Sequence, residues 1–222
     1  MAARKDREEV YRHLSEAATY SGYDRRNLMK AAFMESTFGK NIGEETDTHY
    51  GLMQSEYLYT SPKRDKLEYP DIDREDAAFY YGKEVLDRTK ANEGDSGDLW
   101  GQGRIIEKAK NIGIRDKGFL EYLSWQQGRR GLAEIIHVLD DPDSGLYLGE
   151  SIKGLSGTFS STTRENLTSN MSNADRDYFK GMSDYDLAVR WLNENEQKWE
   201  DYGREIMLLD NEYGDSTWEL PE

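Results

Sequence analysis

Apolar side chains recur every three or four residues along most of the chain, which is the spacing of one face of an α-helix. In residues 7–20 that face holds Val10, Leu14, Ala17 and Ala18. A second helix is predicted after Asp24, whose side chain can cap its first turn. Its inner face consists of Leu28, Ala31, Ala32 and Glu35. The chain is therefore expected to begin with two amphipathic helices, and the apolar stripe of the second ends on a carboxylate.

Further helices are predicted beyond a polar loop at residues 39–48. One spans residues 73–90, and three more are separated by short glycine turns. The inner faces of those three hold Ile105, Ile106, Ala109 and Ile112, then Phe119, Tyr122 and Leu123, then Leu132, Ile135, Ile136 and Leu139. Strict alternation of apolar and polar residues, which would indicate strands, is nearly absent. The predicted fold class is therefore mostly α.

The last third of the chain changes in character twice. Residues 141–182 are rich in Ser, Gly, Thr, Asp and Asn, which predicts an irregular arm without regular secondary structure. Ser183 and Asp186 then form a capping box that starts a long helix. Its predicted inner face holds Ala188, Trp191, Leu192, Asn195, Trp199, Tyr202, Ile206 and Leu209. We therefore expect a helical domain over 1–140, the arm, and over 183–222 a long helix with an acidic tail that packs on or extends the domain.

Composition narrows the classes of protein to consider. The 222 residues are 36% apolar and include five Trp and fifteen Tyr, which predicts a folded chain with an aromatic core. The absence of cysteine excludes disulfides and cysteine metal sites. A net charge of −15 argues against nucleic acid and anionic lipid as partners, although residues 1–40 and 100–139 are mildly basic. We expect no membrane span, since no apolar stretch approaches about 20 residues, and no secretory signal.

Glu35 is the strongest candidate for chemistry in the sequence. A carboxyl group that ends an apolar stripe can be kept protonated by burial, and it can then act as a general acid. The alternative is a structural glutamate at the boundary of the helix. By contrast, His13, His49 and His137 show no metal-ligand spacing, so the sequence implies no metal.

The residues around Glu35 carry a resemblance to a known family. The motif Glu35-Ser36-x-Phe38, followed by a loop and by Gly51-Leu52-Met53-Gln54, resembles the soluble lytic transglycosylases. These lysozyme-like enzymes cleave the MurNAc to GlcNAc bond of peptidoglycan. The stretch from Tyr122 to Gly128 is similar to the Tyr-Leu-x-His-Gln-Gln-Gly segment of phage virion members, with Trp125 in place of His. The segment from Asn166 to Asn193 also resembles their closing segment, so the resemblance covers about residues 9–195.

The resemblance implies a goose-type, lysozyme-like catalytic domain over 1–140 with Glu35 as its catalytic residue. Glu35 would first protonate the glycosidic oxygen and then, as a base, deprotonate the C6 hydroxyl of MurNAc to give a 1,6-anhydro product. A hydrolase would instead need a second carboxylate, for which Glu44, Glu45 and Asp47 are candidates, although solvated loop acids are the alternative. The resemblance implies no cofactor. The implied substrate-binding residues are Ser36, Gly51, Leu52, Met53, Gln54, Trp125, Gln126 and Gln127.

The resemblance also implies where the protein would act. It suggests a phage virion protein, carried in the tail or ejection apparatus, that degrades the host periplasmic cell wall during genome ejection. Its partners would be peptidoglycan glycan strands and phage tail or ejection proteins. Two alternatives stay open from the sequence: a structural tail or ejection protein that keeps the fold without activity, and an endolysin released with the help of a holin.

Overall fold

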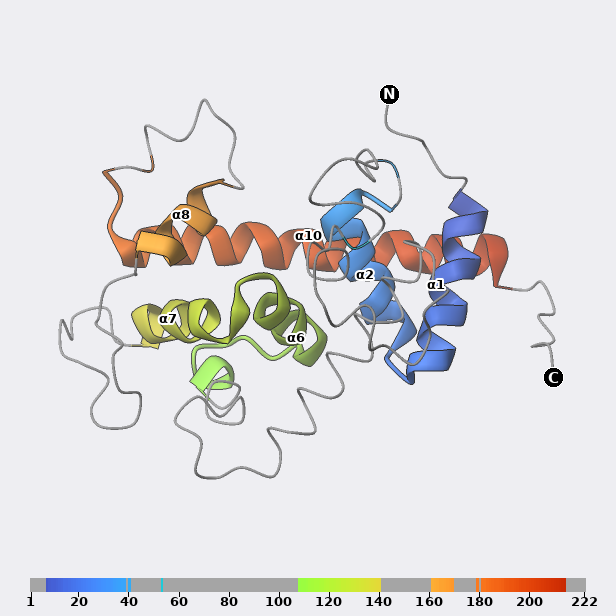
Figure 1. The fold of residues 1–222 in the computed structure, drawn as a ribbon, viewed down its shortest axis with the longest axis horizontal. Helices are drawn as coiled ribbons and strands as arrows, with labels where there is room; N and C mark the ends of the chain where they lie inside the picture. The colour runs from blue at the N-terminus through green and yellow to red at the C-terminus, as the bar shows by residue number, and fades with distance from the viewer. Residues whose placement is uncertain are drawn as a thin grey trace, which may run out of the picture. The chain divides into compact units, whose positions relative to one another are not determined.

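The computed structural model describes residues 7–38, 40, 53, 108–140, 161–169, 179 and 181–214. Of these residues 84% are helical and none lies in a strand, which confirms the predicted mostly α fold. The helices are α1 (Arg7–Ser21), α2 (Arg25–Ser36), α6 (Lys117–Gln126), α7 (Gly128–Asp140), α8 (Ser161–Ser169) and α10 (Asp184–Tyr213) (Figure 1). None of these helices is both long enough and apolar enough to cross a membrane. The predicted helix at 73–90 lies outside the described residues.

Two compact units make up the chain. The first consists of residues 1–87 together with 198–222, and the second consists of residues 88–197. The boundary between them falls inside α10, so this helix contributes its N-terminal part to the second unit and its C-terminal part to the first. The predicted boundaries near residues 140 and 183 followed changes of composition along the sequence. The first unit, by contrast, joins two distant stretches of chain.

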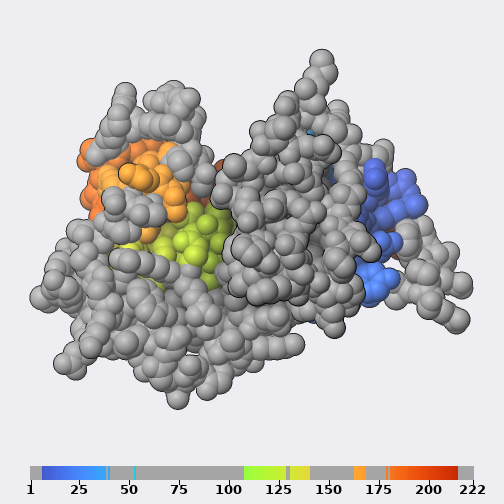
Figure 2. All heavy atoms as spheres, in the orientation of Figure 1, coloured from blue at the N-terminus to red at the C-terminus, as the bar shows by residue number. Residues whose placement is uncertain are grey.

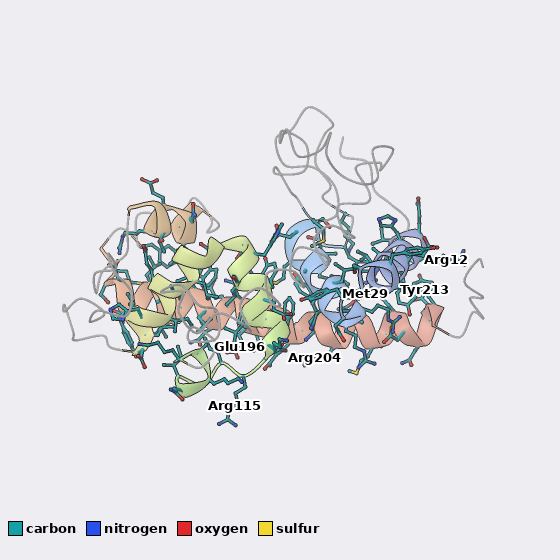
Figure 3. The ribbon with its side chains drawn as sticks, turned by 60° about the horizontal axis from the view of Figure 1, so that its bottom comes forward. Arg12, Met29, Arg115, Glu196, Arg204 and Tyr213 are labelled. Carbon is teal, nitrogen blue, oxygen red and sulfur yellow. The ribbon has the colours of Figure 1, made fainter. Side chains whose placement is uncertain are left out.

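Among the described residues, the first unit holds α1, α2 and the C-terminal part of α10. Gly22, with a φ of 73°, ends α1, and Asp24 begins α2 by accepting a hydrogen bond of 2.8 Å from the backbone N–H of Asn27. The predicted inner faces of these helices are confirmed, because their aliphatic positions are buried. The fully buried side chains include Leu14, Leu28, Met29 (labelled in Figure 3), Trp199 and Ile206.

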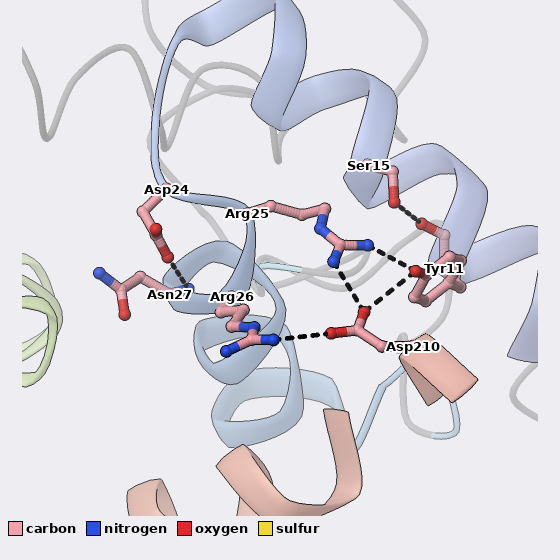
Figure 4. A network of polar contacts seen from close by, with 7 residues as sticks. All are labelled: Tyr11, Ser15, Asp24, Arg25, Arg26, Asn27 and Asp210. Atoms are coloured by element: carbon pink, nitrogen blue, oxygen red, sulfur yellow. Dashed lines mark hydrogen bonds and ion pairs between the residues drawn. The ribbon is translucent and has the colours of Figure 1, made fainter. Parts of the chain in front are cut away.

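A polar network joins the end of α10 to both N-terminal helices (Figure 4). The carboxylate of Asp210 accepts a hydrogen bond of 3.0 Å from the hydroxyl of Tyr11. It also forms ion pairs of 2.8 Å with Arg25 and 3.4 Å with Arg26. Since Asp210 is mostly buried and has three partners on two helices, it fixes how the end of α10 lies against α1 and α2.

The second unit has α7 as its central helix. Residues 131–138 of α7 are all buried, and a helix that is buried on every side lies inside its domain. It packs against α6, which Asp116 caps by accepting a hydrogen bond of 3.0 Å from the N–H of Phe119 (Figure 1). Arg115, in the turn before α6, points outward from the unit (Figure 3). The predicted core positions Phe119, Tyr122 and Leu123 on α6 and Leu132, Ile135 and Ile136 on α7 are all buried, whereas the predicted position Leu139 is half-buried.

Residues 161–169 form α8, within the stretch that was predicted to be irregular. Ser and Thr are weak helix formers, so the helix depends on its contacts rather than on propensity. Leu167 is fully buried, and Arg164 donates hydrogen bonds to the backbone oxygens of Phe179 (3.1 Å) and Met182 (2.6 Å) and pairs with Asp184. Figure 2 shows α8 beside α7 on one face of the unit. Composition could not reveal these anchors, because they lie far along the chain.

The corner between α6 and α7 gives a first prediction. Gly128 has a φ of 67°, and a Cβ added there would meet nothing within 4 Å. We expect Gly128→Ala to lower the free energy of unfolding by about 1–2 kcal/mol, because a left-handed backbone conformation is strained for any side chain. Urea denaturation followed by circular dichroism measures this loss.

Gly181→Ala is the matched control for this prediction. A Cβ at Gly181 also meets nothing within 4 Å, but its φ is not in the left-handed region. We expect this variant to be as stable as the wild type or slightly more stable, because alanine restricts the unfolded chain. An equal loss of stability in both variants would contradict the role given to the φ of Gly128.

Candidate active site

Glu35 lies in the last turn of α2, one residue before the helix ends, and its side chain is half-buried. The next residue, Ser36, is fully buried, and its hydroxyl donates a hydrogen bond of 2.9 Å to the backbone oxygen of Ala32. The Ser36 hydroxyl thus helps to fix the end of the helix. Contact between Ser36 and a substrate stays a prediction.

The chain reverses sharply after Ser36. Thr37 is in the left-handed conformation, with φ 53° and ψ 43°, and Phe38 has a φ of 57°. The N–H of Thr37 donates to the oxygen of Phe33 (3.1 Å), and the N–H of Phe38 donates to the oxygen of Ala32 (3.2 Å). The bond from Thr37 to Phe33 is that of the αL motif at a helix end, and both bonds satisfy carbonyl groups that the helix end would otherwise leave without partners. The turn that follows Glu35 is therefore closed by hydrogen bonds.

Aromatic rings support the same turn. The ring of Phe38, which is 1% exposed, stacks on Phe33 with 4.4 Å between centroids. Phe33 in turn stacks on Tyr202 of α10 at 4.8 Å. Met53, the described residue of the second motif, is fully buried in the same unit. The first and second motifs thus both contribute residues to the core of the first unit.

The third motif occupies the end of α6. Trp125 and Gln126 are half-buried, whereas Gln127 is only 8% exposed. The amide nitrogen of Gln127 donates a long hydrogen bond of 3.4 Å to the side-chain oxygen of Gln126, and its own buried side-chain oxygen has no hydrogen-bond donor. Gly128 follows with its positive φ. The Gln-Gln-Gly sequence therefore marks the corner between two helices, and its glycine has a conformational reason to be there.

The predicted site residues fall into two groups. Glu35, Ser36 and Met53 belong to the first unit, where Glu35 and Ser36 come together at one helix end. Trp125, Gln126 and Gln127 come together in the second unit. The other predicted positions lie outside the described residues; they are Gly51, Leu52 and Gln54, together with the loop acids Glu44, Glu45 and Asp47.

The structure also buries ionisable side chains that sequence reasoning did not select. Glu134 is 1% exposed and His137 is 3% exposed, and both lie on α7. The sequence held one signal of this burial. Glu134 and His137 are three residues apart on the predicted helix, and this spacing places both among its core positions Leu132, Ile135 and Ile136. Within the described part of the chain, no three His, Cys, Asp or Glu side chains are grouped so that they could hold a metal ion.

Burial also affects Tyr202, the tyrosine that stacks on Phe33, and predicts a response to alkaline pH. Desolvation, aided by the negative charge of Asp201, raises the pKa of Tyr202 above its usual value of 10. The stability that this group contributes is complete below pH 10 and is lost as the pH rises through the pKa of the folded state. We expect thermal stability to fall above about pH 10 and to fall less in Tyr202→Phe, as measured by melting curves between pH 8 and 11. An identical decline in both proteins would refute this assignment.

Comparison with known proteins identifies no relative of the chain. No family model, no curated protein and no solved structure matches the chain. The motifs of the sequence and the local geometry around them are therefore what bears on the function of the protein.

Proposed function

We propose that the protein is a peptidoglycan lytic transglycosylase in which Glu35 is the catalytic residue. The observation that carries the proposal is the place of Glu35: it is half-buried at a helix end that hydrogen bonds and stacked rings hold in one conformation. A general acid must be held within reach of the atom it protonates, and a fixed helix end provides that constraint. The likeness of the surrounding sequence to the soluble lytic transglycosylases supplies the reaction.

The helix itself supports the role of Glu35 as an acid. The carbonyl groups at the C-terminal end of a helix carry partial negative charge, which favours a neutral carboxylic acid over a carboxylate. Partial burial acts in the same direction, because it removes water from the charged form.

The proposed reaction uses the one carboxyl group twice. Glu35 donates its proton to the glycosidic oxygen while the bond from that oxygen to C1 of MurNAc breaks, and positive charge develops on the MurNAc ring. The resulting carboxylate takes the proton of the C6 hydroxyl as O6 bonds to C1. The enzyme is thereby returned to its starting state, the product is 1,6-anhydroMurNAc, and no water is consumed.

The third motif would provide sugar-binding groups in this proposal. The half-buried indole of Trp125 can stack on the C–H face of a sugar ring. The amide of Gln126 can bind hydroxyl or N-acetyl groups. Gln127 has a buried side-chain oxygen that lacks a donor, and a sugar N–H or O–H could satisfy it.

Product analysis tests the proposal directly. Purified sacculi are digested with the wild-type protein and with Glu35→Gln, and the released muropeptides are identified by mass spectrometry with and without borohydride reduction. We expect anhydro-muropeptides, which borohydride leaves unchanged, from the wild type alone. Muropeptides with reducible ends would indicate a hydrolase. No product from either protein would favour the structural tail or ejection protein.

We propose further that the protein is carried in a phage particle and acts on the host cell wall during genome ejection. The support for this proposal is the Gln126-Gln127-Gly128 segment, which resembles the corresponding segment of phage virion enzymes. Mass spectrometry of purified particles is the test. Detection of the protein at a constant copy number per particle would support the virion role. Detection of the protein only in the lysate would support an endolysin.

A further inference from the structure

The turn after Glu35 combines two unusual backbone conformations. Thr37 and Phe38 are the non-glycine residues with positive φ among those that the structure describes, and they are adjacent. A β-branched residue such as Thr37 rarely adopts this conformation, and glycine is the usual residue at this position of a helix end. Strain of this kind persists only where surrounding contacts enforce it, and it concentrates at functional sites. The turn is therefore a candidate for a functional role.

The enforcing contacts extend from α2 to a helix far along the sequence. The ring of Phe38 stacks on Phe33, and Phe33 is held between Phe38 and Tyr202, with interplanar angles of 19° and 17°. These three rings form what we call the aromatic stack. Phe38 is almost fully buried, so its backbone cannot relax out of the left-handed conformation without withdrawing the ring from the core. Tyr202 thus contributes to holding a turn that begins two residues after Glu35.

We propose that Phe38 and Tyr202 are positioning residues that hold the last turn of α2, and with it the carboxyl group of Glu35, in the reactive position. This proposal rests on the transglycosylase function proposed above. Helix ends normally fray, and a displacement of about 1 Å at a catalytic group can cost about 100-fold in rate. The aromatic stack and the strained turn remove that freedom where the acid is located. Neither residue needs to touch the substrate for this role.

Two substitutions separate positioning from stability. Tyr202→Leu removes the outer ring of the aromatic stack, and we expect kcat to fall about 10-fold or more with KM changed less than about twofold. Thr37→Gly relieves the strain, so the Tm should rise by about 2–4 °C. It also frees the turn, and we expect kcat to fall several-fold although the protein is more stable. A purely structural turn would give the opposite result for Thr37→Gly, with activity preserved.

Control variants isolate the aromatic stack. Tyr202→Phe keeps the ring and should keep kcat. Tyr213→Leu makes the same change on the same helix, where the ring packs against Tyr11 at 5.6 Å, and it should leave kcat unchanged. Backbone order parameters from NMR provide a readout independent of turnover. We expect them to drop at residues 34–38 in Tyr202→Leu and in Thr37→Gly, and to stay unchanged in Tyr213→Leu.

The outcomes distinguish this proposal from the one on which it depends. Kinetics on soluble glycan strands are measured for all variants and for Glu35→Gln. An inactive wild type would overturn both proposals. An active wild type with an inactive Glu35→Gln, but with kcat preserved in Tyr202→Leu and Thr37→Gly, would overturn the positioning role alone. If Tyr202→Leu fails to fold, the result for Thr37→Gly decides, because that variant is expected to gain stability.

Discussion

Glu35→Gln is expected to lower kcat on peptidoglycan strands by about 10²–10⁴-fold, which is the usual contribution of a general acid or base. Glutamine has nearly the same shape and leaves the end of α2 intact, but it cannot donate the proton or take it back. Because the reaction would use this one group in both steps, no second residue compensates for its loss. The measurement is single-turnover release of anhydro-muropeptides, which reports the chemical step rather than product release.

Two comparisons make this result specific. Glu16→Gln changes a glutamate of α1 in the same unit that is half-buried like Glu35, and we expect wild-type rates from it. Glu35→Asp keeps the acid but withdraws it by one methylene, and it should lose activity through misplacement while retaining part of the rate. Comparable rates for the wild type and Glu35→Gln would remove Glu35 from the mechanism.

Trp199→Ala is expected to cause the largest loss of stability, about 3–5 kcal/mol. Trp199 is 1% exposed and is the largest of the fully buried side chains in the part of the chain that the structure describes. Its replacement would leave a cavity where α10 meets α2, since Lys30 lies over the indole with its Nζ 4.9 Å from the ring. Urea unfolding followed by far-UV circular dichroism measures the change, with a lower midpoint and an unchanged slope expected.

Two further variants separate the contribution of the buried indole from that of Lys30 above it. Lys30→Met removes the cation from the ring but keeps an apolar stem over it, so we expect a loss of only about 0.5–1 kcal/mol. Trp199→Phe keeps an aromatic ring and should lie between the two. If Trp199→Ala were no less stable than Lys30→Met, burial of the indole would not be what holds this part of the core together.

The helices could be predicted because their periodicity is strong and their caps are local. Asp24, Asp116 and Ser183 each receive a hydrogen bond from the backbone N–H three residues later. The predicted inner face of α10 is buried from Ala188 to Leu209, apart from the half-buried Tyr202. Periodicity does not show, however, which other helix the apolar face of a helix packs against. The anchoring of α8 and the joining of residues 1–87 with 198–222 in one unit depend on such long-range pairings, and neither could be predicted.

The candidate site was predictable to a similar extent. The register of α2 placed Glu35 at the end of an apolar stripe, and the structure places it half-buried in the last turn. The strained turn was not predictable, because Thr37 and Phe38 adopt a conformation that their own preferences oppose. Only the stacking of Phe38 on Phe33, and of Phe33 on Tyr202 of α10, explains why they do so. Local preferences gave the position of the acid, while distant contacts set the geometry around it.

The division of α10 between the two units has a consequence for folding during synthesis. The second unit is one continuous stretch of chain, so it can fold as soon as residue 197 has left the ribosome. The first unit must wait for Trp199, which is made about 160 residues after Phe38. At roughly 5–20 residues per second this delay is about 8–30 s. During that time the apolar faces of α1 and α2, including the ring of Phe33, lack their partner helix and would be open to chaperones.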